Sequence, residues 1–124
     1  MIMLDTHIAI ALYDGRTAGL SRQTLHAIDR QPVALSPAVL LELELLHEIG
    51  RTRVGAASIA KELEADLAIR VAGERFRDVA VEALALGFTR DPFDRLIVAH
   101  AALLKAPLVT HDHLLARHYR AVLQ

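Results

Sequence analysis

The stretch IMLDTHIAIALYDG, residues 2–15, decides the fold class. It opens with a short apolar run, residues 2–4, that stops at Asp5 and Thr6, which is typical of a buried strand. The residues that follow, 7–15, predict a short helix that ends near Gly15. A buried strand followed at once by a helix is the repeating unit of parallel α/β sheets. Asp5 is therefore expected at the carboxyl end of a strand, where such sheets carry their sites.

The same pattern recurs along the rest of the chain. Further strands are predicted at residues 33–35, 68–72, 107–110 and 121–123, the last at an edge of the sheet. Helices are predicted at residues 21–30, 37–50, 55–67, 75–86 and 112–119, with one more beginning at Asp91-Pro92. Ser21 and Ser36 are the expected N-caps of the first two of these helices. Short apolar strands that alternate with helices predict a parallel sheet covered on both faces.

Composition narrows the class of protein. The 124 residues suit one domain, residues 1–124, and a content of 53% hydrophobic residues excludes a disordered chain. The net charge of −1 gives no strong overall field for nucleic acid or membrane, although a local site can still be charged. The absence of cysteine excludes disulfides, zinc–thiolate sites and cysteine nucleophiles. The run IAIALY is too short to span a bilayer and a poor signal peptide, so we expect a cytoplasmic protein.

Two aspartates are expected at one rim of the sheet. Asp5 follows the first predicted strand, and Asp112 lies two residues beyond the strand at 107–110. Simpler roles are open to both residues, because aspartate is common in turns and at helix N-caps. Asp112 also begins the last predicted helix, which fits a cap equally well.

Glu42 falls within the apolar stripe of the predicted helix at 37–50. At about 100° per residue, that stripe is formed by Val39, Leu43, Leu46 and Ile49. The opposite side, which we expect to be solvated, carries Glu44, His47 and Glu48. A carboxylate on the core-facing side costs free energy unless a cation or hydrogen-bond donors meet it. A salt bridge to a nearby arginine is the alternative to a functional role for Glu42.

Two aspartates open the helix in RDPFDRLIVAHA, residues 90–101. Asp91 precedes Pro92 and is expected to be the N-cap. Asp94 is the third helical residue, where a carboxylate can cap the chain or interact favourably with the helix dipole. Asp94 also lies on the side of the helix that carries apolar residues in the later turns, so we expect it to face the interior. In that orientation it would meet the carboxylates expected at the rim of the sheet.

Four clustered carboxylates carry a chemical implication. They repel one another, so they take up protons or require a cation. Oxygen ligands without thiols favour a hard metal, Mg²⁺ or Mn²⁺. Such a metal can activate water and neutralise a phosphodiester during displacement. The constellation therefore indicates metal-dependent phosphodiester hydrolysis.

Four segments together resemble the PIN-domain family, and more narrowly its VapC-type toxins. They are MLDTHIAIAL, LSPAVLLELELL, RDPFDRLIVAHA and PLVTHDHLL, in the order found in the family and spread over nearly the whole chain. The resemblance implies a three-layer α/β/α sandwich with a central, mainly parallel sheet of four to five strands. It also implies a Mg²⁺- or Mn²⁺-dependent endoribonuclease, the toxin of a type II toxin–antitoxin system. Such toxins are typically homodimers, inhibited by a small antitoxin that inserts into the active-site groove.

The resemblance also implies roles for individual residues. The catalytic acidic residues of the family map onto Asp5, Glu42, Asp94 and Asp112. Among these, Asp5, Asp94 and Asp112 are the expected metal ligands. The supporting positions are Thr6, Asp91 and Thr110.

Basic residues near these positions are candidate contacts to RNA. The candidates are Arg90, Arg95, His111 and His113. The two arginines are expected either to grip RNA phosphate or to pair with the carboxylates. The two histidines are expected to bind water or substrate phosphate, with metal ligation as the alternative. His7 is expected either to line the cleft or to pack, and His100 to be a hydrogen-bonded core residue.

The sequence also leaves alternative functions to consider and predicts an association state. A PIN nuclease of housekeeping RNA maturation and a non-catalytic PIN-like binding module are the alternatives to a toxin. The complete acidic set argues against the non-catalytic module. A phosphatase of the haloacid dehalogenase type needs a second aspartate where this chain has His7, which excludes it. Apolar residues on the helices at 42–50 and 55–67 predict a two-fold homodimer.

Overall fold

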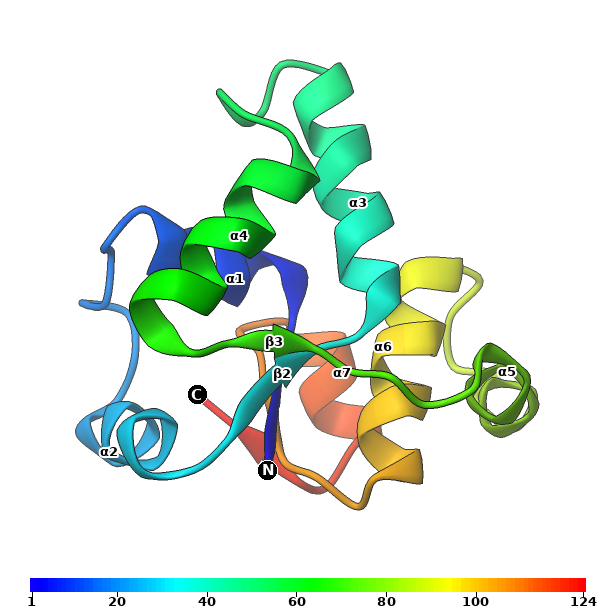
Figure 1. Ribbon diagram of the computed structural model, residues 1–124. Coiled ribbons are helices and arrows are strands. Elements are labelled where there is room, and N and C mark those ends of the chain that lie inside the picture. The colour runs from blue at the N-terminus through cyan, green and yellow to red at the C-terminus, as the bar shows by residue number, and fades with distance from the viewer.

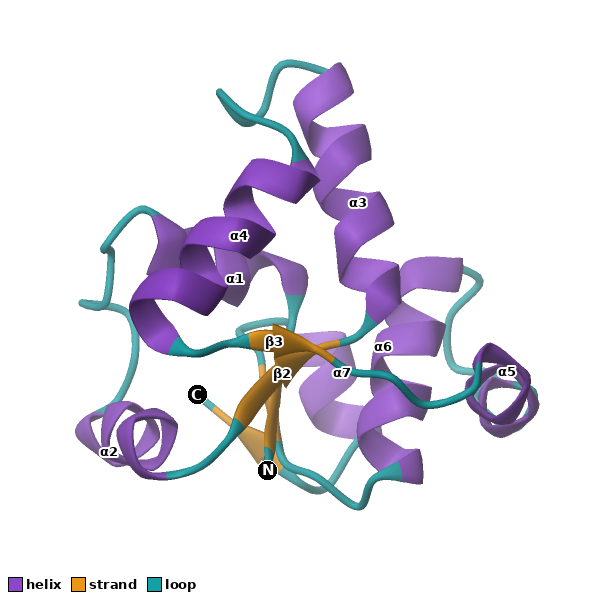
Figure 2. Ribbon diagram, viewed as in Figure 1, coloured by secondary structure: helices purple, strands orange, loops and turns teal.

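The computed structural model describes all 124 residues and places a five-stranded sheet between layers of helices (Figures 1 and 2). The strands are β1 (Ile2–Leu4), β2 (Val33–Leu35), β3 (Arg70–Val71), β4 (Leu108–Val109) and β5 (Val122–Leu123). Their order is β3-β2-β1-β4-β5, and every pair of neighbours is parallel. The predicted α/β/α fold with a parallel sheet is therefore confirmed, and so is the edge position of the last strand.

Seven helices cover the sheet. They are α1 (Thr6–Tyr13), α2 (Arg22–Arg30), α3 (Pro37–Glu48), α4 (Ala56–Leu67), α5 (Phe76–Ala83), α6 (Pro92–Leu103) and α7 (His113–His118). In Figure 1, α1, α3 and α4 pack together above the sheet, whereas α6 and α7 lie to the right of it with α5 outermost against α6. No helix combines the length and the apolar character needed to cross a membrane.

The predicted caps begin the helices as expected. Ser21 accepts a hydrogen bond from the Thr24 amide (3.1 Å), and Ser36 accepts one from the Ala38 amide (3.3 Å). Gly50, just beyond α3, has φ +80°, the left-handed conformation that favours glycine after a helix. The strand predicted at 68–72 is only two residues long, because Ala68 takes a left-handed conformation (φ 55°) as the C-cap of α4.

The outer end of α3 differs from the prediction. Ile49 is 67% exposed, because α3 extends beyond the edge of the sheet that its first turns cover (Figure 1). Glu44 is not simply solvated, since its carboxylate accepts a hydrogen bond from the Ala56 amide (3.1 Å). The N-cap of α4 is Gly55, which has no side chain to offer, and Glu44 supplies the missing acceptor from the neighbouring helix.

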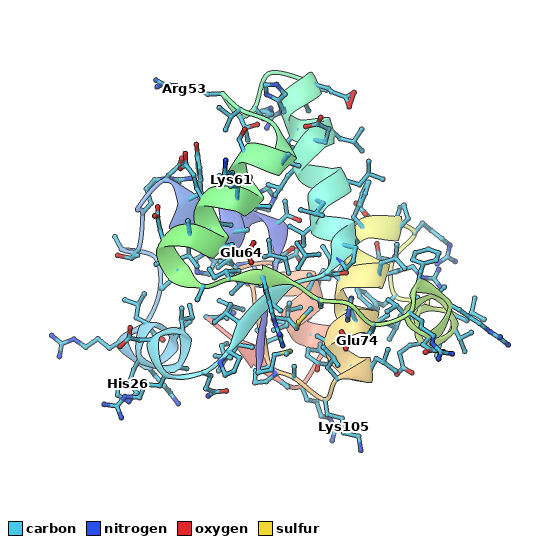
Figure 3. The ribbon with its side chains drawn as sticks, viewed as in Figure 1. His26, Arg53, Lys61, Glu64, Glu74 and Lys105 are labelled. Atoms are coloured by element: carbon cyan, nitrogen blue, oxygen red, sulfur yellow. The ribbon has the colours of Figure 1, made fainter.

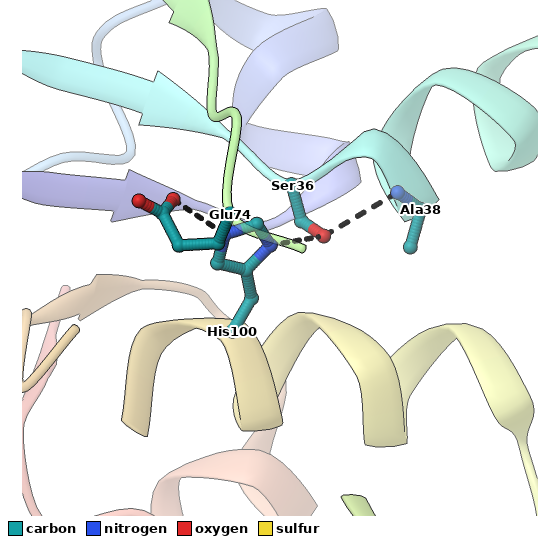
Figure 4. A network of polar contacts seen from close by, with 4 residues as sticks. All are labelled: Ser36, Ala38, Glu74 and His100. Atoms are coloured by element: carbon teal, nitrogen blue, oxygen red, sulfur yellow. Dashed lines mark hydrogen bonds and ion pairs between the residues drawn. The ribbon is translucent and has the colours of Figure 1, made fainter. Parts of the chain in front are cut away.

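His100 confirms the prediction of a hydrogen-bonded core histidine (Figure 4). It is 1% exposed, and its Nδ1 and Nε2 atoms each lie 3.0 Å from a partner, Ser36 Oγ and Glu74 Oε1. The hydrogen bond with His100 is the main reason why the pKa of Glu74 is lowered. The network joins α6 to the start of α3 and to the segment before α5, so it fixes the two helices that carry Asp94 and Glu42.

Candidate active site

Asp5 lies at the end of β1 and is only 5% exposed. Its Oδ1 accepts a hydrogen bond from the Thr6 amide (2.8 Å), which makes it the N-cap of α1. Its Oδ2 accepts a hydrogen bond from Thr110 Oγ1 (2.6 Å). Because β1 and β4 are neighbours in the sheet, Thr110 at the end of β4 comes directly beside Asp5. The cap and the site are thus compatible roles for one carboxylate.

Glu42 is brought to Asp5 by Thr6. The buried Thr6 hydroxyl donates a hydrogen bond to Glu42 Oε1. Burial raises the pKa of the Glu42 carboxyl, the Thr6 hydrogen bond opposes this effect, and the charges of Asp5 and Asp91 raise the pKa further. The arginine salt bridge considered for Glu42 does not form in the structure, whose ion pairs join Arg16 to Asp14 and His100 to Glu74.

Asp94 has a strongly raised pKa. The pKa of this half-buried carboxyl is raised to about 7, first by burial and then by the charges of Asp91, Asp5, Glu42 and Asp112, in that order. Its side chain does not cap α6, because the Asp94 amide itself donates to Asp91 Oδ1 (3.2 Å). The Asp94 carboxylate is therefore held among like charges without a hydrogen-bond donor.

Asp91 and Asp112 are exposed N-caps at the border of the site. Asp91 Oδ1 also accepts a hydrogen bond from the Phe93 amide (2.9 Å), which confirms the predicted cap of α6. Asp112 Oδ1 caps α7 by accepting from the amides of Leu114 (2.8 Å) and Leu115 (3.1 Å). In each case the cap uses one carboxylate oxygen, which leaves the second oxygen of Asp112 available for a cation.

Thr110 connects the Asp5 carboxylate to the backbone of Asp112. It is fully buried, donates to Asp5, and accepts a hydrogen bond from the Asp112 amide (3.0 Å). Sequence reasoning alone assigned no such link, because the link depends on β4 lying next to β1. A threonine at the end of a predicted strand is the only local signal for it.

The donor set fits a hard divalent cation by its chemistry. It consists of carboxylate oxygens supported by two threonine hydroxyls, the ligand type that Mg²⁺ and Mn²⁺ prefer. The pKa values of Glu42 and Asp94 are raised first by burial and further by neighbouring carboxylates, and a cation would relieve that repulsion. As the side chains lie, no three acidic or histidine side chains approach closely enough to enclose a metal ion. The charge of the cluster, and not a preformed cage, is the basis of the fit.

The candidate RNA contacts lie in two places. Arg90 Nη1 donates to the Gly87 carbonyl (3.0 Å), and Arg95 Nη2 donates to the Ala83 carbonyl (3.0 Å) at the end of α5. Neither arginine pairs with a carboxylate of the site, which removes one of their two expected roles. His111 and His113 are exposed on either side of Asp112.

A divalent cation is expected to raise the melting temperature, and to do so more at pH 8 than at pH 5.5. Binding to the folded state alone stabilises it by about 2.7 kcal/mol at 100 times Kd. Protons compete with the metal at low pH, because the pKa of Asp94 is about 7 and that of Glu42 is also raised. Thermal unfolding with and without millimolar Mn²⁺ checks this prediction. An equal shift at both pH values, or none at pH 8, would contradict it.

Comparisons with known proteins agree with the fold. The profile of the family described as PIN domain matches residues 2–121. The fold is similar to that of a chain in a VapBC2 complex from Rickettsia felis, bound to a DNA fragment from its promoter, with TM-score 0.65 and 20% identity. It is also similar to that of a chain in a toxin–antitoxin complex from Klebsiella pneumoniae, with TM-score 0.66 and 19% identity. Each comparison covers 100% of this chain, and 98% and 97% respectively of the other. No curated protein matches the chain.

Proposed function

The chain belongs to the PIN domain family, and from this premise we propose that it is a metal-dependent endoribonuclease, the toxin of a VapC-type toxin–antitoxin pair. The observation that supports the proposal most is the pKa of Asp94, raised to about 7 by burial and by four neighbouring carboxylates. Such a concentration of negative charge destabilises the folded protein. A bound catalytic cation would offset this repulsion, which is why the cluster supports a metal-dependent function.

The proposed chemistry assigns separate tasks to the residues. Asp5, Asp94 and Asp112 would hold Mg²⁺ or Mn²⁺, with Glu42 beside them. The bound cation would supply positive charge at the phosphodiester and favour its attack by water. Glu42 is proposed to receive the proton of the attacking water at Oε2, since its Oε1 already accepts the Thr6 hydroxyl. Its raised pKa suits a group that must take up a proton near neutral pH.

Thr6 and Thr110 are proposed as positioning residues. Each donates one hydrogen bond that orients a carboxylate, Thr6 to Glu42 and Thr110 to Asp5. Outer partners of this kind hold a metal ligand in one rotamer and typically alter metal affinity or activity by about 10- to 100-fold when removed. Asp91 is proposed to support the site through the cap of α6 alone.

Partner proteins are proposed from the surface and from the similar structures. Both similar structures are complexes of a toxin with its antitoxin, which supports a small antitoxin as the partner of this chain.

Large exposed apolar side chains gather on α3 and α5, including Leu41, Ile49, Phe76 and Leu84. We propose that part of this surface forms a homodimer. The exposed set favours α3 and α5, whereas α4 contributes only Leu67.

Expression of this chain alone is expected to arrest bacterial growth, and co-expression with the short reading frame beside its gene is expected to restore it. Hydrolysis of RNA blocks protein synthesis. A cationic side chain of the partner protein, inserted among the carboxylates, would exclude the metal. Growth curves after induction, with Asp94→Asn as the inactive control, measure both effects. A wild-type chain that is soluble and harmless would contradict the toxin and favour a housekeeping nuclease or a binding module.

A further inference from the structure

A separate hollow lies beside α1, the helix that Asp5 caps. It is formed by α1 and the connection of residues 14–21 that leads to α2, and it encloses about 650 Å³. This volume lies within the range of about 300–1,000 Å³ that is usual for small-molecule sites. Its wall also includes His111, which comes from the connection between β4 and α7.

The hollow shares one wall with the carboxylate site. His7 lines it from the first turn of α1, two residues after Asp5, and its charge slightly opposes the raised pKa of Glu42. His111 lies between Thr110 and Asp112 in the sequence. A strand of RNA whose phosphodiester lies at the carboxylates would therefore bring its next nucleotide to this hollow.

The residues that line the hollow suit both the base and the phosphate of a nucleotide. The half-buried Ile10 and Ala11 supply apolar surface for a base, while His7, Arg16 and His111 supply ring and guanidinium N–H groups for a phosphate. No acidic residue lines the hollow. Histidine rings are also among the platforms on which proteins stack the unpaired bases of single-stranded RNA.

We propose that this hollow binds one nucleotide of the RNA, adjacent to the scissile phosphodiester, with His111 against the base and His7 at the phosphate. The proposal rests on the proposed ribonuclease function and extends it to the choice of cleavage site. Arg16 contributes from the rim, where Asp14 orients its guanidinium (3.0 Å).

A substitution at Gly19 can displace the His111 ring while both histidines and all carboxylates of the site stay unchanged. A Cβ atom added at Gly19 would lie 3.2 Å from His111 Cε1, closer than usual, so the ring must move by a few tenths of an ångström. The backbone of Gly19 is not in the left-handed region, so alanine is tolerated there. Gly73, where an added Cβ meets nothing within 4 Å, gives a matched control.

The first test maps cleavage sites in a pool of random-sequence single-stranded RNA with Mn²⁺. His111→Ala and Gly19→Ala are expected to change the preference at one nucleotide beside the cut by at least about fivefold, the low end for loss of one base stack. His26→Ala and Gly73→Ala are expected to keep the wild-type pattern. His26 is exposed on α2 (Figure 3) and does not line the hollow.

The second test measures binding without cleavage. In an Asp94→Asn chain, nucleoside 5′-monophosphates at millimolar concentration are expected to shift the imidazole NMR signals of His7 and His111, but not that of His26. Inorganic phosphate is expected to shift the His7 signal more than that of His111. Shifts by phosphate as large as those by nucleotides at His111, or no shift at either ring, would overturn the nucleotide subsite.

The two proposals fail in different ways. A wild-type chain that cleaves no RNA with metal would defeat the proposed function. A wild-type chain that cleaves RNA, with an unchanged pattern in both His111→Ala and Gly19→Ala, would defeat the subsite alone. An unchanged pattern combined with weaker retention of a co-expressed antitoxin would make the hollow a protein-binding site and would also overturn the proposal.

Discussion

Replacing Asp94 with asparagine is expected to slow RNA cleavage by on the order of 100- to 1,000-fold while the chain remains folded. The Asp94 amide, and not its carboxylate, takes part in the cap of α6, so the charge can be removed without loss of a structural contact. Asparagine keeps the size of the side chain but cannot supply a negative charge to a cation. Initial rates on a labelled RNA with Mn²⁺, together with circular dichroism of both proteins, measure the effect.

The same substitution is expected to stabilise the metal-free protein at pH 8. The folded-state pKa of Asp94, about 7, lies above its ordinary value of 3.8. The contribution of this carboxyl to stability is therefore fully present below about pH 4 and is lost as the pH rises through about 7. Asparagine resembles the protonated carboxyl and avoids that loss. Thermal unfolding in a chelator should show the variant above the wild type at pH 8, with the difference shrinking toward pH 5.

Asp91→Asn is the matched control for Asp94→Asn. Asparagine caps a helix as well as aspartate does, so α6 should begin at the same residue. The substitution also removes the neighbouring charge that contributes most to the raised pKa of Asp94. Most of the cleavage activity is expected to remain. Equal losses of activity in the two folded variants would contradict the separation of cap from ligand.

Replacing Asp5 with asparagine is expected to abolish metal-induced stabilisation and to slow cleavage by on the order of 100-fold or more. The amide oxygen can still accept from the Thr6 amide, which preserves the cap of α1. The amide nitrogen then faces Thr110 Oγ1, which turns from donor to acceptor and leaves its own proton without a partner. That buried hydroxyl costs about 1 to 3 kcal/mol of stability.

Asp29→Asn separates the loss of a site carboxylate from the loss of one negative charge. Asp29 is exposed on α2, and the substitution changes the net charge by the same amount. It should keep both the Mn²⁺-dependent melting shift and the cleavage rate. A Mn²⁺ shift that persists in Asp5→Asn would show that the cation binds elsewhere.

Local sequence signals predicted most of the fold. Strand runs such as residues 2–4 and caps such as Ser21 and Asp91 act within a few residues, so the sequence contains them in full. The strand predicted at 68–72 was too long, because the left-handed C-cap at Ala68 is adopted without glycine and leaves no local signal.

Features that join distant segments were less predictable. The capping of α4 by Glu44 depends on how α3 and α4 pack, and the exposure of Ile49 depends on where the sheet ends. For the site, helical periodicity placed Glu42 and Asp94 inward, but only the order β2-β1-β4 brings them to Asp5 and Thr110. The roles of these residues as metal ligands and catalysts remain predictions.

Cleavage of a purified single-stranded RNA by the wild-type chain, with and without Mn²⁺ or Mg²⁺, tests the central claim most directly. The proposed site predicts internal cuts that require the cation, cease when a chelator is added, and return when the metal is restored in excess. Cleavage that continues in the chelator, or an intact RNA in the presence of folded protein and millimolar metal, would contradict a metal-dependent nuclease built on Asp5, Glu42, Asp94 and Asp112.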